Sequence, residues 1–268
     1  MRIRANLQIG AAAALVLLTG AALLAQFTGY PQTEPLFKDG QSFPVENMQE
    51  HAEWTFARFR YDVGGFGRFQ RWEADYPKAD RQFVMGVKRL TRISARSTEH
   101  VVDADSDVLF DYPWIYVEDP GAWELSDAQA KRLREYIDRG GFIMLDDSWG
   151  NREWSVMAEG VSRILPGRPI QDIAADDPIF HAVFDVVNPV QIPGTRHIWG
   201  ARRRLGPDEI HPRWAAVRDE KGRIVIAICQ NADTGDAWEW ADSPQYPEAP
   251  TTQAYRIGID YIIYAMTH

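Results

Sequence analysis

The sequence predicts an α/β fold, a three-layer sandwich in which a mainly parallel sheet carries helices on both faces, with a β-hairpin near the C-terminus. Two observations support this prediction. From residue 54 onward, strand-like apolar runs alternate with amphipathic helical segments, which is typical of parallel strands joined by crossover helices. Toward the C-terminus, the strand-like runs 214–219 and 223–231 flank Glu220-Lys221-Gly222, and a short glycine-containing turn between strands indicates a hairpin.

The first half of the domain supplies two predicted strands and one helix. Residues 54–61 are the first strand candidate, and Phe83 and Val87 follow at helical spacing. Residues 107–117 are the second strand candidate. Pro113 argues against a central position for the first half of that strand, because proline cannot donate a hydrogen bond to a neighbouring strand.

The middle of the chain contains the clearest helix signals. Ser126 and Gln129 form a capping box, apolar residues follow at helical spacing, and Gly140-Gly141 ends the helix. Residues 142–145 then predict a short buried strand, and residues 154–165 predict an amphipathic helix.

The N-terminal segment predicts export. Arg2 and Arg4 precede an apolar stretch, so residues 1–25 have the shape of a secretory signal peptide, or of an N-terminal anchor if the segment is kept. The stretch is short against the ~20 apolar residues that span a bilayer, which favours removal. Residues 26–50 are rich in proline, glycine and polar residues and predict a linker. We expect a periplasmic protein, anchored to the inner membrane only if the segment remains.

Length and composition bound the class of protein. The chain has 268 residues, of which 45% are hydrophobic, and this content excludes a disordered or fibrous protein. The last predicted helix covers residues 255–266. We expect a single α/β domain over residues 51–268, which includes this helix. The formal net charge of -9 argues against nucleic acid as a partner. The single cysteine, Cys229, excludes an internal disulfide.

Acidic and aromatic residues follow the predicted strands. In open α/β sheets, ligands bind beyond the carboxyl ends of the strands. Residues 118–119 follow the second predicted strand, 146–149 the third, and 231–240 the hairpin. Carboxylates flanked by tryptophans suit sugars, which carry hydroxyls around an apolar ring face. The candidate ligand-binding residues are Arg58, Tyr61, Glu118, Asp119, Asp146, Asp147, Ser148, Trp149, Asn231, Asp233, Asp236, Trp238 and Glu239.

The roles of these residues stay open. Close carboxylates raise one another's pKa, so one can hold a proton while another stays ionised. Asp146 and Asp147 are therefore candidates for catalysis. Ser148, which follows them, is the third candidate because of a resemblance described below, and none of the three is assigned a catalytic role. Alternatively, Asp147 or Ser148 caps the helix that follows. Trp149 and Trp238 are expected to lie in loops beside the acids.

The first predicted strand carries two arginines. Arg58 and Arg60 lie on one face of the first predicted strand, and arginines inside a covered sheet need carboxylate partners. They either form structural ion pairs inside the protein, which we favour, or hold an anionic ligand.

We expect no cofactor and no metal site. The acidic run 103–107 lacks the glycine and glutamate of a calcium loop, and a divalent metal held by the strand-end acids is a lesser alternative.

Several motifs together resemble one family. They are Phe56-Ala-Arg-Phe-Arg-Tyr61, Asp75-Tyr76-Pro77, Leu109-Phe-Asp-Tyr-Pro113, Gly140-Gly-Phe-Ile-Met-Leu-Asp-Asp147 with Trp149-Gly150, and Gly235-Asp-Ala-Trp-Glu-Trp240. Over residues 53–268 the chain looks like the exported family called domain of unknown function 4159. The resemblance implies a class I glutamine amidotransferase-like fold, which is flavodoxin-like and shared with ThuA-like proteins, and it implies no established activity.

The wider resemblance to amidotransferases can be followed to their reactive residues. Their nucleophilic cysteine follows a strand in a sharp turn, and Ser148 takes the matching place in this chain. Serine without a neighbouring base is a weak nucleophile. ThuA-like proteins place Gly-His after a strand where this chain has Gln230-Asn231, and Asp177 replaces the histidine of their His-Pro-Ile segment. The resemblance therefore implies the scaffold without its thiol and imidazole chemistry.

Two functions compete at this point. We expect an exported, non-catalytic module that binds a small polar ligand, a glycan or an envelope protein partner. The alternative is a carboxylate-dependent enzyme acting on a glycan or polyol, with Glu118, Asp146, Asp147 and Asp236 as acid and base. The arrangement of the strand-end acids separates the two.

Overall fold

The computed structural model describes residues 52–63, 71–200 and 204–268. The predicted signal peptide or anchor at 1–25 and the predicted linker at 26–50 lie outside these residues. Within the described ranges, no helix has both the length and the apolar character that crossing a bilayer requires.

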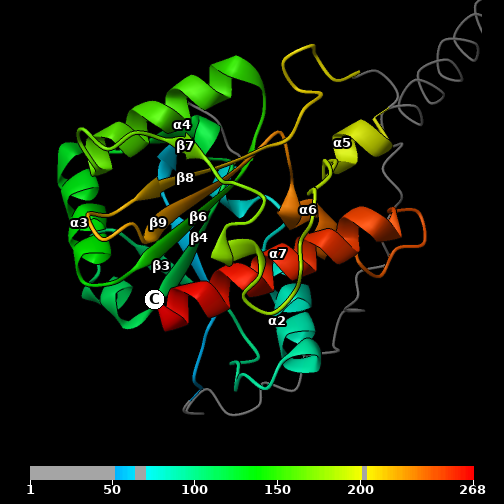
Figure 1. Cartoon of the computed structure of the whole chain (residues 1–268), viewed down its shortest axis with the longest axis horizontal. Helices are drawn as coiled ribbons and strands as arrows, with labels where there is room; N and C mark the ends of the chain where they lie inside the picture. The colour runs from blue at the N-terminus through cyan, green and yellow to red at the C-terminus, as the bar shows by residue number, and fades with distance from the viewer. Residues whose placement is uncertain (1–51, 64–70, 201–203) are drawn as a thin grey trace, which may run out of the picture.

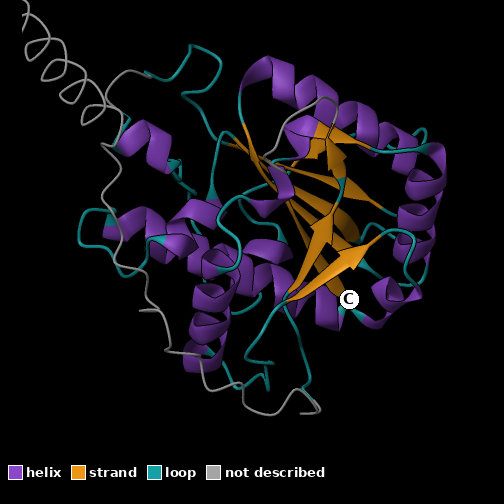
Figure 2. Cartoon of the chain, turned by 180° about the vertical axis from the view of Figure 1, so that it is seen from behind, coloured by secondary structure: helices purple, strands orange, loops and turns teal. Residues whose placement is uncertain are grey.

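Among the described residues, the main sheet has seven strands in the order β3-β1-β4-β6-β9-β8-β7. The parallel strands are β1 (Ala57–Arg60), β3 (His100–Asp103), β4 (Trp114–Glu118), β6 (Phe142–Ser148) and β9 (Ile224–Gln230). β8 (Arg213–Arg218) pairs antiparallel with β9, and β7 (Gln171–Asp172) pairs antiparallel with β8. A separate small pair joins β2 (Asp62–Val63) to β5 (Trp123–Glu124). The mainly parallel sheet, visible in Figure 2, and the C-terminal hairpin of β8 and β9 are therefore confirmed.

Helices cover both faces of the sheet, as Figure 1 shows. α2 (Lys78–Leu90), α6 (Thr234–Glu239) and α7 (Glu248–Thr267) pack on one face, and α3 (Asp127–Asp138) and α4 (Gly150–Ile164) pack on the other. The short helix α5 (Thr195–Ile198) is held to α6 by hydrogen bonds from Thr195 to Asp236. Short 3-10 helices lie at Arg71–Glu73, Asp107–Asp111, Pro120–Ala122 and Pro178–Phe180. The three-layer sandwich is confirmed.

Local chemistry explains where the helix α3 begins and ends. The Ser126 hydroxyl accepts a hydrogen bond from the Gln129 N–H, and the Gln129 side chain accepts one from the Ser126 N–H at 2.9 Å. This capping box pairs two backbone donors that the first turn of the helix leaves free. Gly140, with a φ of 106°, follows the last turn in a conformation that favours glycine. The predicted boundaries of this helix are confirmed.

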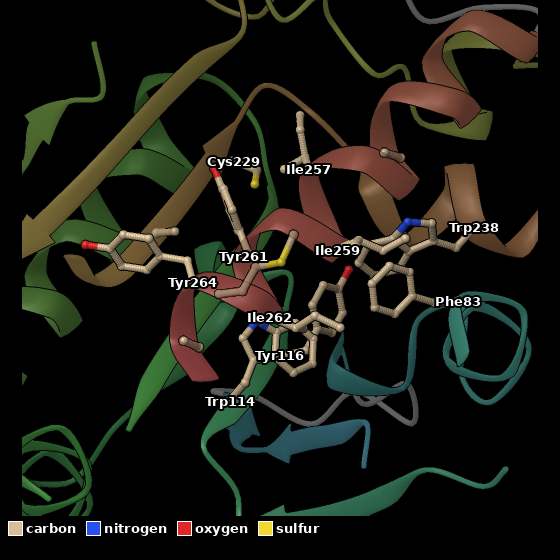
Figure 3. Packing of buried hydrophobic residues seen from close by; sticks show 14 of the residues in the cluster. Phe83, Trp114, Tyr116, Cys229, Trp238, Ile257, Ile259, Tyr261, Ile262 and Tyr264 are labelled. Carbon is tan, nitrogen blue, oxygen red and sulfur yellow. The ribbon is translucent and has the colours of Figure 1, made fainter. Parts of the chain in front are cut away.

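The core under α2, α6 and α7 is rich in aromatic side chains (Figure 3). Phe83 of α2 and Trp238 of α6 have ring centroids 4.2 Å apart, and Tyr116 of β4 lies 5.4 Å from Trp238. The core under α3 and α4 is more aliphatic and includes Leu133 and Val161. Trp238 thus fixes α6 against β4, and this packing positions the polar residues at the start of α6 beside the end of β4.

The structure corrects several local predictions. Residues 107–111 form a 3-10 helix instead of a strand, and β4 begins directly after Pro113. β6 continues to Ser148 instead of ending at Leu145, so the acids at 146 and 147 belong to the strand. Trp238 lies in α6 and is fully buried, so the prediction that it lies in a loop is wrong.

Candidate functional site

The carboxyl ends of β4, β6 and β9 lie side by side at one edge of the sheet. The strand register pairs Glu118 of β4 with Asp146 of β6, and Ser148 of β6 with Gln230 of β9. Successive strand residues normally face opposite sides of a sheet. A register shift between Leu145 and Ser148, with a φ of 56° at Asp147, interrupts that alternation. Asp147 consequently lies close to Glu118.

Five carboxylates gather at this edge in two overlapping groups, which we call the acidic cluster. One group is Glu118, Asp147 and Asp233, and the other is Asp75, Asp233 and Asp236. Within each group, one oxygen from each side chain lies within 4.8 Å of the others. Asp233, at the start of α6, belongs to both groups. Of the strand-end residues proposed from the sequence, Glu118 and Asp147 belong to the first group and Asp236 to the second, whereas Asp146 and Asn231 belong to neither.

The hydrogen bonds of the acidic cluster leave oxygens without donors. Glu118 Oε2 accepts a hydrogen bond from the Tyr116 hydroxyl, while the buried Oε1 has no partner. Asp147 Oδ1 accepts from Trp149 Nε1 and, at 3.4 Å, from Arg196 Nη2. In the part of the chain that the structure describes, no donor reaches the second oxygen of Asp147.

The remaining members of the cluster show the same pattern. Asp233 Oδ1 accepts from the Asp236 N–H at 2.7 Å, and Asp236 Oδ2 accepts from the N–H and hydroxyl of Thr195. Within the described ranges, neither oxygen of Asp75 has a hydrogen-bond donor, and the other oxygens of Asp233 and Asp236 have none either. Every member of the acidic cluster thus keeps at least one open oxygen.

Burial and mutual repulsion disfavour full ionisation of the cluster. Burial raises the pKa of Glu118 well above its usual range, and the charges of Asp75 and Asp147 raise it further. Burial likewise raises the pKa of Asp75 and of Asp233 well above the ordinary value, with Asp236 adding to both shifts. Burial raises the pKa of Asp147 to about 6, although the Arg196 charge opposes the shift. The predicted elevation of carboxylate pKa values is found, with burial as its largest cause.

Arginine side chains neutralise only part of the negative charge in and around the cluster. Arg71 Nη1 lies 2.9 Å from Asp119 Oδ2, yet burial still raises the pKa of Asp119 to about 8. Arg196 contacts Asp147 and lies over the Trp149 ring, 5.2 Å from its centroid. Trp149 is itself buried and donates to Asp147, so the tryptophan and the arginine approach the cluster together.

Arg58 makes its hydrogen bonds outside the cluster, although its charge partly offsets the rise that burial causes in the pKa of Glu118 and of Asp75. Its Nε donates to both oxygens of Asp80 at 3.0 and 2.9 Å, and its Nη1 donates to the carbonyls of Trp72 and Ala74, each at 3.0 Å. Arg58 and Asp80 are fully buried. The structural interpretation of this arginine therefore fits its contacts.

Tyr61 contacts the backbone at the end of β4. Its hydroxyl donates to the carbonyl oxygens of Glu118 and Asp119, at 2.8 and 2.7 Å. Tyr61 therefore holds the backbone that carries Glu118.

Asp146 is tied into the fold beside the cluster. Its Oδ2 accepts from the Tyr116 hydroxyl at 2.8 Å, the Thr234 N–H at 2.7 Å and the Gly235 N–H at 3.0 Å, and also from the Thr234 hydroxyl. Burial raises the pKa of Asp146 to about 7, and the hydrogen bonds from Thr234 and Tyr116 lower it. This carboxylate joins β6 to α6 and has little freedom to transfer a proton to a ligand.

Ser148 and Asn231 lie next to each other but take other roles. The Ser148 hydroxyl donates to Gln230 Oε1 at 2.6 Å, and no histidine in the described residues forms a hydrogen bond with it. Asn231 donates to the carbonyls of Asp208 and His211 and accepts from the Gly150 N–H. Trp149, not Asp147 or Ser148, is the N-cap residue of α4, so the capping alternative for those two residues is wrong.

Trp238 and Glu239 lie behind and beside the cluster. Trp238 packs in the aromatic core, and its exposure is 0%. Burial raises the pKa of Glu239 to about 7, with the Asp236 charge as the next cause, and the Lys78 charge opposes the shift. Glu239 therefore shares the electrostatic environment of the cluster without being one of its five members.

Sequence reasoning missed two residues that the structure brings to the site. Asp75 comes from the connection between β2 and α2, and Arg196 comes from α5. Asp75 has a φ of 61°, a conformation that aspartate tolerates better than most residues. The motif Asp75-Tyr76-Pro77 is a signal for Asp75, although only as a family motif. Arg196 follows no strand of the sheet, so the strand-end rule could not select it.

Comparison with known proteins places the chain in a family. None of the curated proteins compared with the chain matches it. The family described as domain of unknown function, DUF4159, matches residues 55–266. This match covers the whole sandwich, from β1 through α7, including every member of the acidic cluster. The chain therefore belongs to the DUF4159 family.

Proposed function

We propose that this protein is an exported, non-catalytic binding module that uses the strand-end edge of an amidotransferase-like scaffold. The single observation that carries the proposal is the acidic cluster, in which five convergent carboxylates keep open oxygens at the edge where α/β sheets bind ligands. Export is proposed from the N-terminal sequence, where Arg2 and Arg4 precede an apolar stretch.

The environment of Ser148 supports a non-catalytic role. A serine nucleophile needs a base that accepts its proton, and that base is commonly a histidine. In this site the Ser148 hydroxyl donates to the side-chain oxygen of Gln230, an amide that cannot act as a base. Cys229 is fully buried within β9, and burial raises the pKa of its thiol well above the usual range. A thiol in that state is a poor nucleophile.

The cluster suits a ligand that brings positive charge or hydrogen-bond donors. Open carboxylate oxygens are acceptors only, so hydroxyl, ammonium or metal-bound groups are their natural partners. Trp149 lies beside Asp147, but its ring is buried and contacts Arg196 and His197, so the carboxylates are the groups left to contact a ligand. A glycan or an envelope peptide is the organic ligand that this chemistry favours.

The carboxylate-dependent enzyme has less support. Glycoside cleavage needs one carboxyl group that can donate a proton to the leaving group and a second that attacks or activates water. Asp146 accepts several structural hydrogen bonds, which commits it to joining β6 and α6.

Calorimetric titration of the full-length chain against envelope glycans and peptides tests this proposal. We expect saturable binding that is lost in Asp147→Ala and kept in Asp103→Ala, because Asp103 lies outside the cluster and pairs with Arg60. Product analysis after long incubation should find every glycan intact. Time-dependent cleavage that disappears in Asp147→Ala would establish the enzyme instead. If no panel member binds but a stable partner co-purifies with both variants, the cluster is not the binding surface.

A further inference from the structure

The acidic cluster has a charge that its neighbours do not balance. It holds Asp75, Glu118, Asp147, Asp233 and Asp236, and within the described residues the contacting guanidinium is that of Arg196, beside Asp147. Arg58 and Arg71, two other arginines nearby, are engaged with Asp80 and Asp119. Buried like charges at this spacing repel one another strongly unless a cation or protons compensate them.

Glu118 provides a second observation that points to a ligand at the cluster. Its side chain is fully buried and contributes an oxygen to the first convergent group, yet its Oε1 has no hydrogen-bond partner. Buried polar atoms without partners are rare in folded proteins, so the environment calls for a ligand that contacts the oxygen directly.

A metal ion can contact the oxygens of one whole group at once. The converging donors are carboxylate oxygens, with no histidine or cysteine among them, and such hard donors select Mg²⁺, Ca²⁺ or Mn²⁺ over zinc or copper. A bare ion also suits a place where Glu118, Asp233 and Asp147 are only 0%, 3% and 8% exposed. An ammonium group on a larger molecule needs more room.

The closeness of the oxygens fits hard divalent cations. Oxygens on opposite sides of Ca²⁺ lie about 4.6–5.2 Å apart, and around Mg²⁺ they lie about 4.0–4.2 Å apart. The oxygens of each group lie within 4.8 Å of one another, so each group can surround an ion of this kind. We propose that the acidic cluster binds a hard divalent cation such as Ca²⁺, with Asp233 as the ligand common to both groups.

The cation site rests on the proposed function and deepens it, since it names a ligand for the same cluster. In a binding module, the cation would neutralise the cluster and leave coordination positions for hydroxyl or carboxylate groups of an organic ligand. The binding of the metal alone does not depend on that second ligand. A titration with metal salts therefore succeeds or fails independently of any search for glycans or peptides.

The test is calorimetric titration of EDTA-treated, full-length protein at about pH 7.5 with CaCl₂, MgCl₂ and MnCl₂, and electron paramagnetic resonance of bound Mn²⁺. We expect saturable Ca²⁺ binding that weakens at least about tenfold in Asp233→Asn and in Glu118→Gln. Both substitutions keep side-chain size and a hydrogen-bond acceptor. Asp260→Asn is the matched control, because Asp260 is equally buried but lies on α7, where it accepts from the N–H groups of Val183 and Phe184.

Thermal melts guard against misfolded variants. In EDTA, Asp233→Asn should melt at or above the wild-type temperature, because it removes repulsion, and Ca²⁺ should raise the melting temperature of the wild type only. The proposal is wrong if the wild type binds none of the three ions up to about 10 mM, or if both cluster variants bind as the wild type does. Glycan binding that persists unchanged in EDTA with no metal uptake would overturn the cation site and leave the proposed function standing.

Discussion

The molecule contains two regions of buried charge, the Arg58–Asp80 pair and the acidic cluster, which differ in how completely their polar atoms are hydrogen-bonded. Arg58 of β1 donates to both oxygens of Asp80 and to the carbonyls of Trp72 and Ala74. In the acidic cluster, by contrast, Glu118 Oε1 has no partner, and Asp233 keeps one oxygen without a donor. Among the described residues, the first region is complete and the second is not.

The difference separates buried charges that stabilise the fold from buried charges that a bound ligand would stabilise. A fully hydrogen-bonded ion pair gains nothing from an additional molecule, and removing one partner leaves an uncompensated charge. A set of repelling carboxylates costs stability as it stands and regains it when a cation binds. Substitutions in the two regions should therefore have opposite effects on stability.

The largest effect is expected from Asp80→Ala. The substitution leaves the Arg58 guanidinium buried without its carboxylate, and breaking a buried pair in this way costs about 3–5 kcal/mol. Urea unfolding followed by circular dichroism should show that loss of unfolding free energy, or the variant should fail to accumulate as folded protein. A loss of unfolding free energy below about 1 kcal/mol would show that the buried Arg58 charge does not need Asp80 for compensation. The Arg58–Asp80 pair would then not be an example of a stabilising buried ion pair.

The pH dependence of stability should set the cluster apart from an ordinary protein surface. Burial holds the pKa of Asp147 at about 6 and that of Asp119 at about 8, both above the value of about 3.9 in an unfolded chain. Carboxyl groups with a raised folded-state pKa stabilise the fold below about pH 4, and this contribution is lost as the pH rises toward about 8. In EDTA, the melting temperature should therefore fall by several degrees between about pH 5 and pH 8.

The Asp147→Asn variant tests whether Asp147 contributes to this pH dependence. The variant lacks one of the groups that ionises in this range, so its melting temperature should fall less between about pH 5 and pH 8 than that of the wild type. Differential scanning calorimetry at several pH values measures both curves. A wild-type melting temperature that rises or stays level over this interval would contradict the electrostatic description of the cluster.

Ser148→Ala should have a smaller effect. The variant removes the hydrogen bond to Gln230, which costs about 1 kcal/mol, and it leaves the acidic cluster intact. Ligand and metal titrations should match those of the wild type within error. If Ser148→Ala abolished a measured activity while leaving the fold unchanged, Ser148 would be a nucleophile and not a structural residue.

The smallest effect is expected at Arg60, two residues from Arg58 on the same strand. Arg60 pairs with Asp103, but their side chains are 53% and 39% exposed. Exposed ion pairs contribute about 0.2–1 kcal/mol, so Arg60→Ala should lower the unfolding free energy by no more than that. An effect as large as that of Asp80→Ala would mean that burial does not separate the two pairs.

Local signals predicted much of the fold. The capping box at Ser126 and the turn at Gly222 act within a few residues, and both elements form where the sequence places them. β3 and α6 were not predicted. β3 is a four-residue edge strand, and α6 is a six-residue helix that contains Gly235, so neither carries enough periodic pattern to be recognised.

The site shows the same division between local and distant information. The strand-end rule selected Glu118, Asp147 and Asp233 because they directly follow, or lie at the ends of, neighbouring parallel strands. It could not show that Asp146 Oδ2 accepts hydrogen bonds from Tyr116 and from the start of α6, nor that Asp75 joins from a distant connection. Those facts depend on how α2 and α6 pack around Trp238, which no local pattern encodes.

X-ray diffraction from crystals grown with MnCl₂, recorded at the manganese absorption edge, would locate a cation bound to the acidic cluster. We expect an anomalous peak within about 2.6 Å of an Asp233 oxygen, with Glu118 and Asp147 or Asp75 and Asp236 completing the protein ligands. An ordered cluster without a peak, in which the five carboxyl groups instead share protons through short hydrogen bonds, would contradict this expectation.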